Sequence, residues 1–301
     1  MRHRFGGRVQ KLSIDAAIAC PNRSTAGARG GCTFCLNEAF SPAYCRGEQS
    51  LRRQIDLGLK FHHSRGRHAD YYLAYFQAGT NTNASVDRLR ELYSEVLSHP
   101  AISGLIIGTR PDAISSEKLD MLADFSHDKY VAVEYGVEST FDSTLEHVNR
   151  GHSFDDARWA IAQTRARGLD VGAHFMLGLP YERREQMVEQ TDAINMLGIN
   201  YIKFHQLQIF RSTPMASEWA EYPERFLFAT PGYTPNDYIE LLIDILRRLS
   251  PDIAVDRLFA VAPRSLVVHS PLGGLRPEIL RDMLVRRMVV GGISQGDRFV
   301  R

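Results

Sequence analysis

The sequence has few cysteines, no long apolar run and almost no net charge, and each of these excludes a class of protein. Only four cysteines occur in 301 residues, and three of them lie between positions 20 and 35, which does not fit a secreted disulfide framework. No segment resembles a secretion signal or reaches the length of a membrane span. A formal net charge of +1 excludes a strongly basic field over the whole chain. We therefore expect a soluble cytoplasmic protein with no membrane partner.

The composition is that of a globular protein, and its apolar residues follow a repeating pattern. Hydrophobic residues make up 44% and charged residues 24%, enough apolar material for a substantial core. Short β-branched apolar runs alternate with segments of helical periodicity, which is typical of βα units around a parallel sheet. The strand-like runs are 12–19, 71–76, 104–108, 130–137, 169–179 and 201–210. The helical segments include 85–97, 116–125, 155–167 and 184–197.

Six such units predict a partial (βα)6 TIM-like barrel, with a doubly wound open sheet as the alternative. The pattern changes after about residue 212, where four prolines precede a helical segment at 236–249. A strand-like run at 253–262 and a helical segment at 277–290 follow. We predict that residues 1–212 form the barrel and that residues 213–301 form a C-terminal α+β extension packed on it.

The three clustered cysteines are the strongest chemical signal in the chain. Cys20, Cys32 and Cys35 form a C-x11-C-x2-C arrangement in a glycine-rich segment after the first strand-like run. Thiolates suit zinc or iron–sulfur clusters. A structural zinc ion normally takes four protein ligands, whereas three cysteines around a four-iron cluster leave one iron open to another molecule. A zinc knot completed by Cys45 is the alternative, but the wide gap is unlike two short CxxC knuckles, and we favour the cluster.

Polar or glycine-rich sequence follows each of the next five predicted strands. In a barrel the carboxyl ends of the strands meet at one mouth, where enzymes place their chemistry. These ends therefore predict a ring of functional groups around the mouth. They are Gln77-Ala78-Gly79, Gly108-Thr109-Arg110-Pro111-Asp112, Glu134-Tyr135-Gly136-Val137-Glu138, His174-Phe175-Met176-Leu177-Gly178 and Lys203-Phe204-His205-Gln206.

Several of these residues have a structural explanation as well as a functional one. Glu134 in an apolar strand must be paired if it faces inward, either with a ligand hydroxyl, which we favour, or with a neighbouring Arg or Lys. Arg110 and Asp112 fit an ion pair at the rim as well as a functional role. His174 and Lys203 could line the pocket or belong to a satisfied core.

Taken together, seven segments resemble the radical S-adenosylmethionine (SAM) enzymes. The resemblance is to the branch that contains the elongator catalytic subunit, and most closely to the YhcC/YtqA-type bacterial proteins. The segments are Ala19-Cys20-Pro21-Asn22-Arg23, Gly30-Gly31-Cys32-Thr33-Phe34-Cys35, Tyr75-Phe76-Gln77-Ala78, Gly108-Thr109-Arg110-Pro111-Asp112, Glu134-Tyr135-Gly136-Val137-Glu138-Ser139, Asn149-Arg150-Gly151-His152 and Gly178-Leu179-Pro180.

The resemblance implies a [4Fe–4S] cluster on Cys20, Cys32 and Cys35, whose open iron binds SAM. One electron from an external flavodoxin- or ferredoxin-like donor would cleave SAM to methionine and a 5′-deoxyadenosyl radical, which takes hydrogen from the substrate. The family pattern also implies which residues lie around SAM. They are Phe34 at the adenine, Gln77 at the methionine end, Glu134 at the ribose, Arg150 at the carboxylate, and Thr109, His174 and Leu177 elsewhere in the SAM pocket.

The substrate is less well defined by the sequence. Relatives in the elongator-like branch act on wobble uridines of transfer RNA, and tRNA modification is therefore our leading hypothesis. Two arginine-rich segments could neutralise phosphates or could be solvated surface. They contain Arg2, Arg4, Arg8 and Lys11 at one end and Arg276, Arg281, Arg286, Arg287, Arg298 and Arg301 at the other. A small-molecule or protein substrate, and a zinc-knot RNA-binding scaffold without catalysis, are the alternatives.

Overall fold

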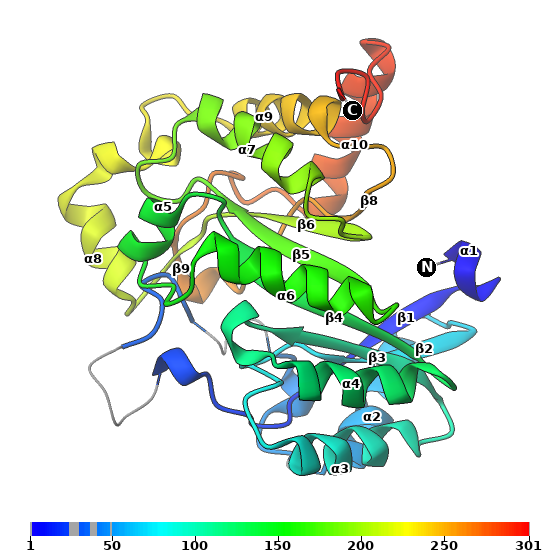
Figure 1. The fold of residues 1–301 in the computed structure, drawn as a ribbon. Coiled ribbons are helices and arrows are strands. Elements are labelled where there is room, and N and C mark those ends of the chain that lie inside the picture. The colour runs from blue at the N-terminus through cyan, green and yellow to red at the C-terminus, as the bar shows by residue number, and fades with distance from the viewer. Residues whose placement is uncertain (1, 24–29, 37–40, 49, 301) are drawn as a thin grey trace.

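The computed structural model describes residues 2–23, 30–36, 41–48 and 50–300. Seven parallel strands form one curled sheet in the order β1-β2-β3-β4-β5-β6-β8 (Figure 1). From β1 to β6, strands that are neighbours in the sheet are also successive in the chain, so each connection is a βα crossover to the next position. The strands are β1 Val9–Ile14, β2 Tyr71–Phe76, β3 Ile102–Thr109, β4 Tyr130–Glu138, β5 Asp170–Leu177, β6 Tyr201–Gln206 and β8 Ala254–Arg257. The predicted partial barrel is confirmed.

Helices cover one face of this sheet and follow the strands in chain order (Figure 1). Serine N-caps begin several of them, because a serine hydroxyl accepts a hydrogen bond from a free amide of the first turn. The main helices are α2 Leu51–His63, α3 Val86–Leu97, α4 Ser116–Ser126, α6 Phe154–Ala166, α7 Arg184–Asn195 and α9 Pro235–Arg248. Short helices are α1 Arg2–Phe5, α5 Asp142–His147 and α8 Pro214–Glu221, and the last helix is α10 Pro277–Val290.

The two faces of the sheet are packed differently. The face toward the helices carries the main apolar core. On the inner face, Tyr75 and Ile106 pack with Leu73 and Ala132, and Phe5 of α1 is packed against this small cluster. Because side chains alternate between faces along a strand, the inward positions of β4, β5 and β6 share one enclosed space. Apolar packing fills part of this space, and polar side chains line the part toward the carboxyl ends.

The C-terminal segment contributes to the sheet as well as packing against it. Strand β8 pairs in parallel with β6 and extends the sheet beyond the six predicted strands. Strands β7 Ile209–Phe210 and β9 Val267–His269 form a separate antiparallel pair. The domain division at residue 212 stays a prediction. In the part of the chain that the structure describes, no helix combines the length and the apolar character needed to cross a membrane.

The loop between β5 and α7 is tightly constrained and buries a carboxyl group. Gly178 has φ +87°, and a Cβ there would lie 2.2 Å from the ring of Phe228, so glycine is required. Glu182 is buried and accepts a 2.5 Å hydrogen bond from the hydroxyl of Ser139. Burial raises the pKa of Glu182 from 4.5 to about 7, although the bond from Ser139 opposes this.

Glu182→Gln should therefore make the stability of the protein less sensitive to pH. A raised pKa means that folding favours the protonated carboxyl, so the wild type loses stability as the pH rises from about 5 to 8, whereas glutamine cannot ionise. The difference in the free energy of unfolding, Glu182→Gln minus wild type, should therefore be about 2–3 kcal/mol larger at pH 8 than at pH 5. Urea unfolding at both pH values measures it, with the exposed Glu185→Gln as the matched control. Parallel pH profiles for the two variants would contradict the prediction.

Candidate active site

A cavity of about 970 Å³ lies at the carboxyl ends of the strands. This volume is at the upper end of the range for ligand pockets, so the cavity can hold a cofactor and part of a second molecule. Nine of the ten predicted site residues line it. They are Cys20, Cys32, Phe34, Cys35, Gln77, Thr109, Glu134, Arg150 and His174.

Leu177 is the exception among the predicted site residues. On β5 the side chains of His174 and Met176 line the cavity, whereas Leu177 is fully buried in the core on the helix side. The alternation of side chains along a strand explains this, because positions 174 and 176 share one face and position 177 has the other. A side-chain contact between Leu177 and a ligand in the cavity is therefore not expected. The neighbouring side chain of Met176 lines the cavity instead.

The sulfur of Cys32 accepts hydrogen bonds from two N–H donors that are distant in the chain. The Asn22 amide lies 3.5 Å from Cys32 Sγ, and Arg150 Nη1 lies 3.4 Å from it. Arg150 also donates a 2.5 Å hydrogen bond from Nη2 to the carbonyl of Gly136. Donors and a positive charge beside sulfur stabilise a thiolate, which is the form that binds metals.

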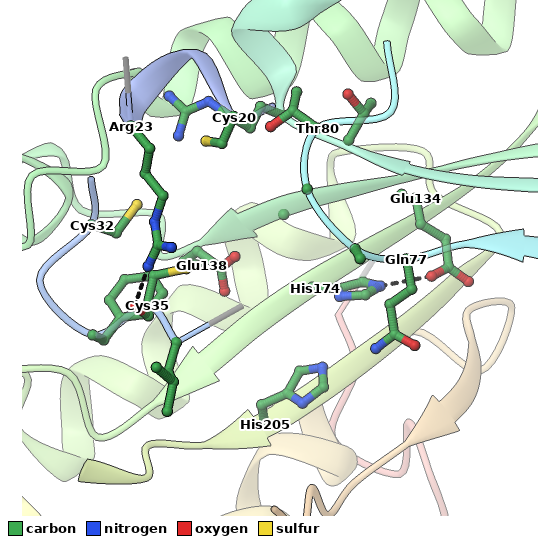
Figure 2. A pocket seen from close by; sticks show the side chains of 18 of the residues that line it. Cys20, Arg23, Cys32, Cys35, Gln77, Thr80, Glu134, Glu138, His174 and His205 are labelled. Atoms are coloured by element: carbon green, nitrogen blue, oxygen red, sulfur yellow. Dashed lines mark hydrogen bonds and ion pairs between the residues drawn. The ribbon is translucent and has the colours of Figure 1, made fainter. Parts of the chain in front are cut away.

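The other two thiols complete one wall of the cavity. Figure 2 shows Cys20, Cys32 and Cys35 on the same side of it. Arg23 donates a 2.5 Å hydrogen bond to the carbonyl of Cys35, and a Cβ on Gly31, where φ is +86°, would lie 2.7 Å from the Arg23 side chain. Any other residue at position 31 would have to adopt a strained backbone conformation and would displace the Arg23 side chain, so glycine is required there.

The fourth cysteine lies elsewhere. The Cys45 thiol is buried, donates to the carbonyl of Ser13 at 3.3 Å and does not line the cavity. Burial raises the pKa of this thiol to about 12. A zinc knot that uses all four cysteines does not match this arrangement, because Cys45 bonds to the backbone of β1 while the other three thiols line the cavity.

The donor set fits a cluster held by three thiolates. No group of three or more His, Cys, Asp or Glu side chains within the described residues has the arrangement that a single metal ion requires. A four-iron cluster is larger than an ion and binds each thiolate at a different iron, so its ligands lie farther apart. Burial raises the pKa of the Cys35 thiol, and metal coordination is what stabilises a thiolate in such a place.

Glu134 is satisfied by protein groups rather than left free for a ligand. Its carboxylate is fully buried and accepts hydrogen bonds from Lys203 Nζ at 2.5 Å, His174 Nε2 at 2.8 Å, the Tyr201 hydroxyl at 3.0 Å and Lys11 Nζ at 3.2 Å. Lys203 and Lys11 hold the pKa of Glu134 well below its usual value, against the effect of burial. The alternative of pairing with neighbouring lysines therefore describes Glu134 better than a ribose contact does.

Three further ionisable residues that line the cavity lay in the segments named from the sequence but were given no role of their own. Glu138 lies 3.6 Å from Arg150 Nη2, and its φ of +75° accompanies a bulge in β4. A Cβ on Gly136 would meet both of these side chains, at 2.7 and 2.8 Å, which explains the glycine. Arg23 and His205 also line the cavity. The Glu-x-x-x-Glu spacing was the available signal for Glu138, because even spacing places both carboxylates on one face of a regular strand.

Comparison with known proteins gives two family matches and several relatives. Residues 22–194 match the family model described as Radical SAM superfamily, and residues 199–286 match the Radical_SAM C-terminal domain. The uncharacterized protein YtqA of Bacillus subtilis is 34% identical over the whole of this chain and 91% of its own length. Protein YhcC of Escherichia coli is 33% identical over 88% of this chain and 82% of its own length.

Two further matches are more distant. The tRNA uridine(34) acetyltransferase of Dehalococcoides mccartyi is 27% identical over 86% of this chain. The solved structure of Elp3 from Methanocaldococcus infernus, with residues 1–46 deleted, has a TM-score of 0.70 at 16% identity and covers 95% of this chain. This chain spans less than two thirds of either, namely 61% of the acetyltransferase and 64% of the Elp3 chain. The Elp3 likeness confirms the fold.

Proposed function

The chain belongs to the radical SAM superfamily, and we propose that it binds a [4Fe–4S] cluster through Cys20, Cys32 and Cys35 and reductively cleaves SAM in order to modify tRNA. The family implies both SAM and the cluster. The observation that carries the proposal is that these three thiols line one cavity at the strand ends while Cys45 lies apart. When bound, the cluster supplies an open iron for SAM and the electron that cleaves it.

The residues of the chain would position SAM and keep water from it. Phe34 would pack on the adenine, and Gln77 would bond to the methionine end. The hydroxyl of Thr109 bonds to that of Thr82 at 2.6 Å, which holds the Thr109 side chain in place. Arg150 is buried, and its Nε has no partner among the described residues, so it retains one donor for the carboxylate. A fixed guanidinium suits a carboxylate because its donors are planar and always charged.

Support for a tRNA substrate comes from one relative and from the charge on one helix. The acetyltransferase named above acts, by its name, on uridine 34 of tRNA. The exposed side of α2 and the turn after it carry Arg52, Lys60, Arg65 and Arg67. Exposed cations can contact the phosphates of a nucleic acid, although the exposed Asp56 lies between Arg52 and Lys60 on the same helix. Lys11, by contrast, is bonded to Glu134 and Asp256, so neither of the two roles considered for it from the sequence, phosphate contact or solvated surface, describes it.

The protein, reconstituted with iron and sulfide without oxygen, should convert SAM to 5′-deoxyadenosine and methionine when a strong reductant is added. A flavodoxin- or ferredoxin-like protein should replace the chemical reductant. Chromatography of the products measures this, with samples lacking iron or reductant as controls. A fully loaded protein that yields no 5′-deoxyadenosine would refute the proposal. Nucleoside mass spectrometry of tRNA from cells with and without this chain tests the substrate, and an unchanged profile would indicate a metabolite or a protein instead.

A further inference from the structure

The part of the cavity wall formed by β4, β5 and β6 presents two histidines. His174 and His205 line the cavity from the adjacent strands β5 and β6, with ring centroids 5.4 Å apart and planes tilted by 38° (Figure 2). The cysteines lie on another part of the wall, so this region is available to a second molecule beside SAM.

Glu134 fixes which nitrogen of His174 carries the proton. Its carboxylate accepts the 2.8 Å bond from His174 Nε2, and the other Glu134 contacts are all donors. A carboxylate only accepts, so Nε2 is protonated and Nδ1 of the neutral ring is an acceptor. Within the described residues Nδ1 has no hydrogen-bond partner, since the single bond of this ring is the one to Glu134. His174 therefore offers one acceptor of fixed direction to the cavity.

His205 offers the complementary group. Its Nε2 is buried and has no hydrogen-bond partner in the described part of the chain. A buried polar atom without a partner is costly, and a bound ligand is one way to satisfy it. A neutral imidazole carries one N–H, so His205 can donate where His174 accepts.

Both rings are neutral near pH 7. Burial and then the positive charge of Lys203 lower the pKa of His174 to about 4. Burial, then His174 and Arg257, lower the pKa of His205 well below its usual value. The charged groups around the pair are Glu134 on β4, Lys203 on β6, Lys11 on β1, and Asp256 and Arg257 on β8. The two histidines are therefore suited to an uncharged ligand.

We propose that His174 and His205 form a substrate subsite that reads an imide edge, the adjacent N–H and C=O of a uracil-type ring. The N–H donates to His174 Nδ1, and the C=O accepts from the N–H of His205. Cytosine presents an acceptor where uracil has the N–H, so its lone pair would face the lone pair of Nδ1. The inference rests on the proposed function, since the ring would belong to the tRNA substrate. It also replaces the SAM contact predicted for His174.

Binding of nucleosides to the full chain tests this subsite without any turnover. The protein is labelled with ¹⁵N-histidine and titrated with uridine, N3-methyluridine and cytidine. Uridine should shift the ring nitrogen signals of His174 and His205, and both competitors should bind at least about tenfold more weakly, as expected from one lost hydrogen bond and an unpaired buried group. The free protein should show a protonated Nε2 on His174. Equal binding of the three nucleosides, or no response to uridine, would overturn the inference.

His174→Gln separates recognition from structure. The glutamine amide reaches the position of Nε2 and keeps the bond to Glu134, but it lacks Nδ1. Discrimination between uridine and N3-methyluridine should disappear in this variant, and it should persist in the control His127→Gln, whose residue is exposed at the end of α4. SAM cleavage by the loaded wild type is measured in parallel. Cleavage without uridine selectivity refutes the subsite alone, whereas selectivity without cleavage refutes the proposed function alone.

Discussion

Replacing any one of Cys20, Cys32 or Cys35 with alanine should abolish SAM cleavage, while Cys45→Ala should leave it intact. Each of these substitutions would remove one of the three thiolates that hold the proposed cluster, and among the described residues no other cysteine lines the cavity to replace it. Cys45 bonds to the carbonyl of Ser13 and takes no part in the cavity. The expected difference between the two classes is at least about 1,000-fold in 5′-deoxyadenosine formed, because the uncatalysed reaction makes no measurable contribution.

The iron content should also separate the variants of the three cavity cysteines from the Cys45 variant. After reconstitution without oxygen, wild type and Cys45→Ala should retain iron and sulfide in equal amounts, and the three other variants should lose most of both. Elemental analysis and the visible absorption of the brown protein measure this. Circular dichroism shows whether each variant still folds, so that loss of iron is not confused with loss of structure. One zinc and no iron in the wild type, lost in Cys45→Ala, would favour a zinc knot and contradict the proposal.

The parallel sheet was predictable from sequence because its strands are buried on both faces. Runs such as Tyr71–Phe76, whose predicted and observed bounds agree, are continuous apolar segments between turn signals. The bounds of the first strand were wrong, since it was predicted at 12–19 and is observed at Val9–Ile14. Ala17 has φ +54°, so the chain leaves the sheet before it, and Ile18 lines the cavity instead. Apolar character alone does not distinguish a strand from a cavity wall.

The predicted end of the sixth strand was wrong for a related reason. The run 201–210 is apolar throughout most of its length, but β6 ends at Gln206. The amides of Gln206 and Gln208 bond to the backbone of Ala260, and Ile209–Phe210 pair with β9 instead. These partners lie about fifty residues away in the chain, so no local pattern contains them.

The sequence predicted that the site residues lie together at the strand ends, but it did not predict which of their side chains bond to one another. The placement of Gln77, Thr109 and Arg150 in the same cavity as the three cysteines follows from the rule that parallel strands end at one mouth. The pairing of Glu134 with Lys11 and Lys203 depends on the curl of the sheet, which brings β1 and β6 to either side of the β4 side chain. Sequence separations of 123 and 69 residues carry no signal for such a contact.

Glu134→Gln should be the most destabilising single change on the inner face of the barrel. The side chains of Glu134 and Lys203 are both fully buried, and Lys203 Nζ has one other carboxylate nearby, Asp256 at 3.6 Å. Burial and the positive charge of Lys11 already lower the pKa of Lys203 to about 8, and the Glu134 carboxylate opposes this by stabilising the charged amine. Removing the carboxylate leaves a buried cation without its main partner, which costs about 3–5 kcal/mol of the free energy of unfolding.

A double-mutant cycle with Lys203→Met shows whether this cost belongs to the pair. Lys203→Met alone should cost less, about 1–3 kcal/mol, because Glu134 keeps its bonds from Lys11, His174 and Tyr201. The double variant buries neither charge and should be more stable than the sum of the single changes by about 1–3 kcal/mol. Urea unfolding measures all three, with Arg88→Gln of the exposed pair with Glu91 as a control expected within about 0.5 kcal/mol of wild type. Strict additivity would show that Glu134 and Lys203 do not stabilise one another, and it would contradict the prediction.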